Sequence, residues 1–269
     1  MKLVRVEELR YELWRSIAEL YRREPLTHAY LLYDLVYELE RVEAAFAVDR
    51  RVRGYVLIWK GARRLGVHVW GDALNLLPLI PLKEEAVIQV YDASLLEPLL
   101  KTVGEGGEVQ VRWYLDMVVS EEEFRPRYGP KVVRLKAGDI EHVRQYVNLK
   151  AAGGIAVEEE EAREVLGKYR YYGVFEEGRL ASIACTYLRL PEVWVIGDVY
   201  THPAYRGRGY AKAATSAITS DAISAGAIAM LHVAEGNEPA LRVYRALGYR
   251  VTGRKPWVFY SPHRATLRD

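Results

Sequence analysis

The apolar positions of the chain change their spacing from one segment to the next. Near the start, Leu9, Leu13, Ile17 and Leu20 recur every three or four residues, a period that predicts helix. Further on, short runs of β-branched and aromatic residues alternate with charged turns, which predicts strands. The expected elements of this half are helices over 6–23, after 25 and over 94–101, and strands over 45–48, 55–59, 66–70, 86–91 and 109–119.

The pattern restarts after the segment 120–130, which carries acidic residues, two prolines and Gly129 and is the predicted linker. We therefore expect two domains, over 1–125 and 131–269. The second has helices expected over 139–149, 158–166, 207–225 and 238–247, and strands over 132–135, 171–176, 180–188, 193–201, 227–233, 249–252 and 257–260. Interleaved strands and helices predict an α/β fold with a mixed sheet in both halves.

The two halves share a faint similarity. A strand–turn–strand series ends in Val-Trp-Gly-Asp at 69–72 and in Val-Ile-Gly-Asp at 195–198. A diverged internal repeat explains the match, and coincidence is the alternative because the identities are few.

Composition narrows the classes of function. The 38 basic and 36 acidic residues nearly balance, so no global field favours nucleic acid or an anionic membrane as a partner. Cys185 is the single cysteine, which excludes an intramolecular disulfide, and its apolar neighbours predict a core residue. The histidines are scattered, so no metal site is expected. A charged N-terminus and no apolar run of ~20 residues predict a cytoplasmic protein.

Heat-labile side chains are scarce: the chain has three Asn, three Gln, one Cys and three Met. Together with many charges, this indicates a thermophilic host, with ordinary compositional drift as the alternative.

One short segment concentrates positive charge. A strand ending near Thr201 leads into a proline-bearing loop, and Gly207 and Gly209 then open a long helix. Such a turn presents backbone N–H groups and the positive end of the helix dipole to an anion. Arg206, Arg208 and Lys212 add charge there. The segment therefore predicts a local phosphate-binding site that the net charge of +2 does not reveal.

Three interpretations of this turn compete. A Walker P-loop requires a Gly-Lys-Ser/Thr ending, which is absent. A dinucleotide fingerprint requires a third glycine where Lys212 stands, and its first glycine directly after the strand. The pattern Arg206-x-x-Gly209-x-Ala211 instead resembles the pyrophosphate-binding motif of the GNAT superfamily of acetyl-CoA-dependent N-acyltransferases.

A second motif supports this resemblance. The stretch from Asn237 through Ala240 and Tyr244 to Gly248 and Tyr249 is similar to the Asn-x-x-Ala-x-x-x-Tyr-x-x-Leu-Gly-aromatic signature of the same superfamily. Residues four apart share a helix face, and a glycine after a helix is typical of a C-cap. The resemblance covers about half the chain and implies the GNAT fold for the second domain.

The resemblance implies roles for individual residues. Tyr244 would be the general acid that protonates the leaving CoA thiolate, and Asn237 would contact the pantetheine arm. The strand edge at Val199, Tyr200 and Thr201 would bind that arm where the strand diverges from its neighbour. Main-chain groups of six residues would hold the pyrophosphate of acetyl-CoA: Arg206, Gly207, Arg208, Gly209, Tyr210 and Ala211.

The general base is less defined by the sequence. Asp198 is the acid nearest the expected place, and a structural hydrogen-bond acceptor is its alternative role. Glu192, Glu235 and His232 are the other candidates.

The first half has no such cationic turn. After Asp72 the chain reads Ala-Leu-Asn-Leu-Leu-Pro-Leu over 73–79, which cannot cradle a phosphate. This predicts a degenerate GNAT-like half, similar to two-domain glycine N-acyltransferase-like proteins. Those carry a glutamate where Val195 stands, so glycine is not expected as the acceptor.

These observations predict an N-acyltransferase, monomeric or homodimeric. It transfers an acetyl or other short acyl group from acyl-CoA, with acetyl-CoA as the expected co-substrate, to a small-molecule or peptide amine by direct attack in a ternary complex. A CoA-binding sensor or interaction module on the same fold is the alternative. A dinucleotide-dependent oxidoreductase is disfavoured by Lys212.

Overall fold

The chain divides into two compact units, described here by a computed structural model over residues 2–127 and 132–263. The first unit comprises Met1–Leu115 together with Gly253–Asp269, and the second comprises Asp116–Thr252. This division differs from the predicted domains, 1–125 and 131–269. The end of the predicted linker, 128–130, and the predicted domain start at Lys131 lie outside the described residues.

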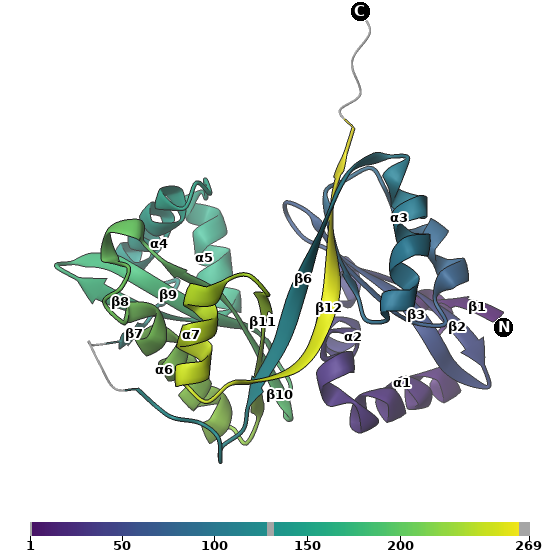
Figure 1. Ribbon diagram of the computed structural model, residues 1–269, viewed down its shortest axis with the longest axis horizontal. Coiled ribbons are helices and arrows are strands. Elements are labelled where there is room, and N and C mark those ends of the chain that lie inside the picture. The colour runs from purple at the N-terminus through teal and green to yellow at the C-terminus, as the bar shows by residue number, and fades with distance from the viewer. Residues whose placement is uncertain (1, 128–131, 264–269) are drawn as a thin grey trace, which may run out of the picture. The chain divides into compact units, whose positions relative to one another are not determined.

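The first unit is a mixed sheet with helices on both faces (Figure 1). Its helices and main strands are β1 (Lys2–Arg5), α1 (Tyr11–Arg23), α2 (Pro25–Tyr37), β2 (Val42–Asp49), β3 (Arg51–Lys60), β4 (Leu65–Gly71), β5 (Ala86–Val90) and α3 (Leu96–Gly104). The strands pair in the order β1-β2-β3-β4-β5, all antiparallel except the parallel pair β4–β5. Ile17 of α1 and Leu31 of α2 pack against one face, and Leu99 of α3 packs against the other.

Two long strands explain why the units differ from the predicted domains. In β12 (Arg250–Pro262), Trp257 pairs with Gln89 of β5, so most of the last strand belongs to the first unit. In β6 (Gly107–Val119), Tyr114 stacks on Trp257 at 4.1 Å between ring centroids, while the residues from Asp116 on belong to the second unit. Figure 1 shows β12 in yellow beside β6 in teal.

The second unit is also a mixed sheet, with strand order β6-β11-β10-β9-β8-β7. Its elements are β7 (Val132–Arg134), α4 (Ile140–Ala152), α5 (Glu159–Lys168), β8 (Arg170–Glu176), β9 (Arg179–Arg189), β10 (Val193–Thr201), α6 (Tyr210–Ser224), β11 (Ile228–Ala234) and α7 (Glu238–Ala246). The pair β10–β11 is parallel, whereas β7–β8, β8–β9 and β9–β10 are antiparallel.

Helices cover both faces of this second sheet. Val143 and Leu149 of α4 and Leu166 of α5 pack with Tyr171 of β8 and Cys185 of β9 on one face. Helix α6 packs against β8, β9 and β10 on the other. The predicted α/β fold class with a mixed sheet is thus confirmed, and Cys185 is a core residue, as predicted.

Several predicted elements change at their ends. The expected strands 249–252 and 257–260 form the single strand β12, which runs through the residues between them and pairs with β5 over Trp257–Tyr260. The helix expected from Gly207 begins at Tyr210, since Gly207 and Gly209 have φ of 78° and 83° and form the preceding turn. Strand β1 was not expected; it pairs with β2.

Within the described residues, no helix combines the length and the apolar character needed to cross a membrane.

Candidate active site

The sheet of the second unit opens where β10 passes β11. The two strands pair in parallel from Val193–Ile228 to Ile196–Leu231, although β10 continues to Thr201. On the other edge of β10, pairing with β9 shifts register between Gly197 and Tyr200, and Asp198 within this bulge has φ of 46°. A bulge of this kind bends and twists a strand. The backbone edge of β10 from residue 199 on is therefore released from β11.

The turn after β10 presents its backbone N–H groups outward. Gly207 and Gly209 adopt φ of 78° and 83°, and a Cβ built on either would meet no atom within 4 Å. The glycines are therefore required by backbone conformation rather than by a close neighbour. Gly209 is the N-cap of α6 and no side chain caps this helix, so its first N–H groups and its positive dipole end remain available to an anion.

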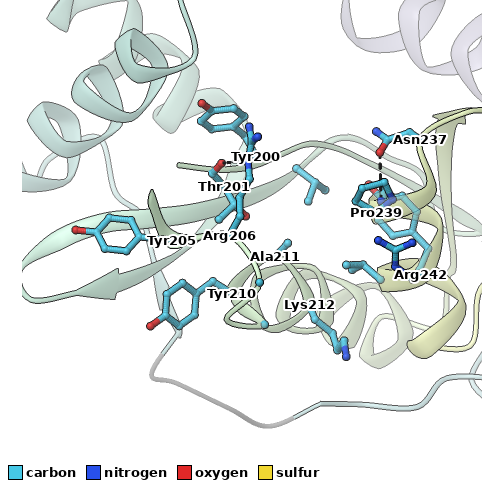
Figure 2. A pocket seen from close by; sticks show the side chains of 16 residues that line it. Tyr200, Thr201, Tyr205, Arg206, Tyr210, Ala211, Lys212, Asn237, Pro239 and Arg242 are labelled. Atoms are coloured by element: carbon cyan, nitrogen blue, oxygen red, sulfur yellow. Dashed lines mark hydrogen bonds between the residues drawn. The ribbon is translucent and has the colours of Figure 1, made fainter. Parts of the chain in front are cut away.

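These segments enclose one cavity of about 770 Å³. Figure 2 shows its lining side chains, which come from the end of β10, from the start of α6 and from α7. Three of the lining residues are cationic, namely Arg206, Lys212 and Arg242, and none of the 16 is acidic. The cavity is therefore suited to a polyanionic ligand.

Most of the residues predicted to bind a cofactor lie together in this lining. They are Val199, Tyr200, Thr201, Arg206, Gly207, Gly209, Tyr210, Ala211 and Asn237, and the predicted general acid Tyr244 joins them. Lys212, which the sequence predicted to add charge at this turn, also lines the cavity. Sequence reasoning gave no ligand role to five others: Tyr205, Pro239, Ala240, Arg242 and Val243. The spacing of Ala240 relative to Tyr244 could have identified one of them, since residues four apart share a helix face.

Arg208 is the predicted phosphate contact that does not line the cavity. Its guanidinium lies 3.5 Å from Glu176 Oε1 and 5.6 Å from the ring centroid of Tyr205. Arg206 remains at the cavity, with its Nε 3.4 Å from the carbonyl oxygen of Thr201. The two arginines therefore have different surroundings, which the motif alone does not distinguish.

Helix α7 holds the second motif in a fixed geometry. The side chain of Asn237 caps the helix by accepting a hydrogen bond from Ala240 N at 3.2 Å. Gly248, with φ of 97°, follows the last turn, as the C-cap pattern predicts. Between them Tyr244 is buried, and burial, with a smaller effect of Tyr187, raises its pKa to about 12. The phenol therefore keeps its proton throughout the neutral range.

Asp198 contacts two side chains on the face of the sheet that α4 and α5 cover. Its Oδ1 and Oδ2 lie 2.8 and 3.0 Å from Lys150 Nζ of α4, and Tyr171 of β8 donates a hydrogen bond of 2.8 Å to Oδ2. The structure thus gives Asp198 an ion pair and a hydrogen bond and does not place it in the cavity lining. Its assignment as the base stays a prediction.

The other base candidates are differently placed. Glu192 and Glu235 are exposed at the two ends of the parallel strand pair, and neither lines the cavity. His232 of β11 lies one residue past the last pair with β10, with Nδ1 2.6 Å from Asp116 Oδ1 of β6. Burial raises the pKa of the Cys185 thiol far above its usual range, which makes this thiol unreactive.

Among the described residues, no group of three or more His, Cys, Asp or Glu is arranged to hold a metal ion. The cavity region combines a cationic turn at a helix N-terminus, the edge of β10 beyond its pairing with β11, and a buried phenol.

Comparison with known proteins finds a family similar to part of the second unit. Residues 142–249, which include the cradle, the diverging strands and α7, match the profile of the acetyltransferase (GNAT) family. This part of the second unit is therefore similar to the GNAT family. No curated protein sequence matches the chain.

Solved structures resemble the whole chain in fold. A GCN5-related N-acetyltransferase-like protein from Streptococcus suis has a TM-score of 0.62 at 14% identity, covering 93% of this chain and all (100%) of that one. A tandem GNAT protein from the clavulanic acid biosynthesis pathway has a TM-score of 0.61 at 14% identity, covering 98% and 100%. A Drosophila protein has a TM-score of 0.66 at 16% identity, covering 93% and 88%.

Proposed function

We propose that the chain is an N-acyltransferase that transfers an acetyl group from acetyl-CoA to an amine of a small molecule or peptide. The observation that carries the proposal is the cationic cavity without lining acids, which begins at the N-terminus of α6 and has the buried Tyr244 in its wall. The thioester would supply an activated acyl group, and the protein would supply orientation and charge stabilisation.

The residues of the cavity fit the parts of acetyl-CoA. The N–H groups of the 207–212 turn, with Arg206 and Lys212, would hold the pyrophosphate. The free backbone edge at Val199–Thr201 would pair with the amide groups of the pantetheine arm, because β11 no longer occupies it. Asn237 contributes its amide nitrogen there, since its side-chain oxygen already caps α7.

Tyr244 would donate its proton to the thiolate that forms when the C–S bond breaks. Its raised pKa, about 12, keeps that proton in place until negative charge develops on the sulfur. We expect Tyr244→Phe to lower kcat by about 100-fold and to leave acetyl-CoA affinity unchanged. Steady-state rates on a panel of amines measure kcat, and calorimetric titration of acetyl-CoA measures its affinity. An unchanged kcat would remove Tyr244 from the mechanism.

A second candidate function is acyl-CoA binding without catalysis, and one observation favours it. The predicted base, Asp198, is already engaged by Lys150 and Tyr171. Acetyl-CoA binding by the wild type without turnover of any amine would support this alternative and contradict the enzymatic proposal.

The proposal also includes the biological setting expected from the sequence: a cytoplasmic protein of a thermophilic host, monomeric or homodimeric, whose first half is a degenerate GNAT-like domain. A melting midpoint at ~45–65 °C, as in mesophile domains, would contradict the thermophilic origin.

A further inference from the structure

We propose that His232, oriented by Asp116, is the group that accepts the proton from the attacking amine. This inference rests on the proposed acyltransferase function. It concerns a pair of side chains from β11 and β6, of which His232 is one of several open candidates and Asp116 was not singled out in the sequence.

The strand register places His232 at the opening of the sheet. The last pair between β10 and β11 joins Ile196 to Leu231, and His232 is the next residue of β11. It is therefore the first side chain of β11 that β10 no longer flanks. A thioester bound along the released edge of β10 would have its reacting carbon beside this position.

The alternation of side chains places His232 on the face covered by α4 and α5. Cys185 lies on that face and pairs with Gly197 of β10. Val195 is two residues before Gly197 on the same strand, so its side chain lies on the same face. Val195 pairs with Met230, and His232 is two residues further along β11. Asp198 contacts Lys150 on the same face. The two base candidates thus flank the opening from its two strands, opposite the face that α6 covers.

The contact with Asp116 sets the tautomer of the imidazole. Asp116 Oδ1 lies 2.6 Å from Nδ1, and an ionised carboxylate can only accept a hydrogen bond. In the neutral ring Nδ1 therefore carries the proton and the basic lone pair is on Nε2. When Nε2 gains a proton, the carboxylate stabilises the imidazolium. An aspartate that orients and stabilises a histidine in this way is a recurrent arrangement in acyl transfer.

Asp198 and His232, the two candidate bases, differ in their charged partners. Both oxygens of Asp198 lie within 3.0 Å of the Lys150 ammonium, so its charge is engaged in an ion pair. In the Asp116–His232 pair the carboxylate belongs to the orienting residue, and the imidazole changes charge with the proton it receives. The side chain of His232 is 3% exposed.

The amine nitrogen bonds to the acetyl carbonyl carbon while one of its protons moves to Nε2 of His232. The C–S bond then breaks with its electron pair on sulfur, and the thiolate takes the Tyr244 proton. The products are the N-acetylated amine and CoA thiol. His232 releases its proton to water, and Tyr244 regains one from water.

The test compares variants of the full chain with acetyl-CoA and the first amine of the panel that the wild type acetylates. We expect His232→Gln to lower kcat/KM about 100-fold at pH 7, to remove the acidic limb of its pH profile, and to retain acetyl-CoA affinity by calorimetry. Asp116→Asn acts through the imidazole, so we expect a loss of about tenfold and a displaced acidic limb. Retained affinity shows that each variant is folded.

His142→Gln is the matched control, because His142 in the same unit also lies near an aspartate, Asp139, at 3.5 Å. It should behave as wild type. If His232→Gln keeps the wild-type rate and acidic limb, or if Asp198→Asn loses that limb instead, the assignment of the base to His232 is wrong. Either result leaves the proposed acyltransferase function in place. Failure of the wild type to acetylate any amine would overturn the proposed function, and with it this inference.

Discussion

Each unit contains a parallel strand pair, and the segment that follows the first strand of the pair differs between the two units. In the first unit β4 pairs in parallel with β5 from Leu65 to Val69, and the chain then enters a short 3-10 helix, Leu74–Leu79, whose Leu76 and Leu77 are 1% exposed. In the second unit β10 pairs in parallel with β11, and the chain then enters the glycine turn and α6.

The difference lies in where the apolar side chains go. The loop after β4 buries Leu76 and Leu77 in the core of the first unit, and its residues 73–79 include no glycine and no cation. The loop after β10 keeps its backbone N–H groups exposed and surrounds them with cations. A parallel strand pair is therefore a scaffold, and the residues directly after it decide whether it carries a ligand site.

The largest effect is expected at the filled loop. Leu77→Ala removes a fully buried side chain from the first unit and should lower the free energy of unfolding by about 2–5 kcal/mol. Chemical denaturation measures this loss, and acetyl-CoA affinity at a temperature where the variant is folded should stay at the wild-type value. A loss of acetyl-CoA binding free energy as large as the loss of unfolding free energy would show that the first unit contributes to the ligand site.

A buried histidine should make the first unit sensitive to acid. Burial lowers the pKa of His28 from 6.5 to about 4, and its Nδ1 lies 3.2 Å from the Tyr55 hydroxyl. Between these values the unfolded state binds a proton that the folded state excludes. Stability is therefore complete above pH 6.5 and falls by up to ~3 kcal/mol as the pH drops to 4.

Denaturation of His28→Gln across pH 4–7 should show a weaker pH dependence than the wild type. Substitution of the exposed His263 by Gln provides the control and should leave the wild-type dependence in place. An unchanged dependence in His28→Gln would contradict the assigned cause.

A smaller effect is expected at the glycine turn. Gly209→Ala leaves the space around the turn open and forces an alanine to φ of 83°, which costs about 1–2 kcal/mol. If the bound state requires this conformation, acetyl-CoA affinity should fall by about tenfold. Gly138, which has open space and no positive φ, gives the matched control Gly138→Ala.

The two arginines of the turn give the smallest expected difference. Arg206→Ala should weaken acetyl-CoA binding by about tenfold, because this side chain lines the cavity. Arg208→Ala should change it by less than about threefold, since its guanidinium faces Glu176. Equal losses for the two variants would mean that Arg208 turns toward the ligand on binding.

Local signals in the sequence were sufficient to predict the elements that line most of this cavity. The strand 193–201 was predicted with the bounds it has in the structure, and α7 to within one residue, because apolar periodicity, a capping asparagine and a following glycine all act within one element. The lining of the cavity by both motifs follows from these elements.

Contacts between distant segments were beyond the sequence. The pairing of β12 with β5, the ion pair of Asp198 with Lys150, and the contact of His232 with Asp116 each join positions far apart in the chain. No spacing rule specifies such partners, because tertiary packing selects among many charged and aromatic residues of similar type. The same reason explains why the contact of the Arg208 side chain with Glu176 was not predicted.

The most direct test of the contrast between the two units is calorimetric titration of acetyl-CoA into the full chain. The proposed account predicts one molecule bound per chain, with an affinity that Gly209→Ala weakens and Leu77→Ala does not. Two molecules per chain, no binding, or equal effects of the two substitutions would contradict it.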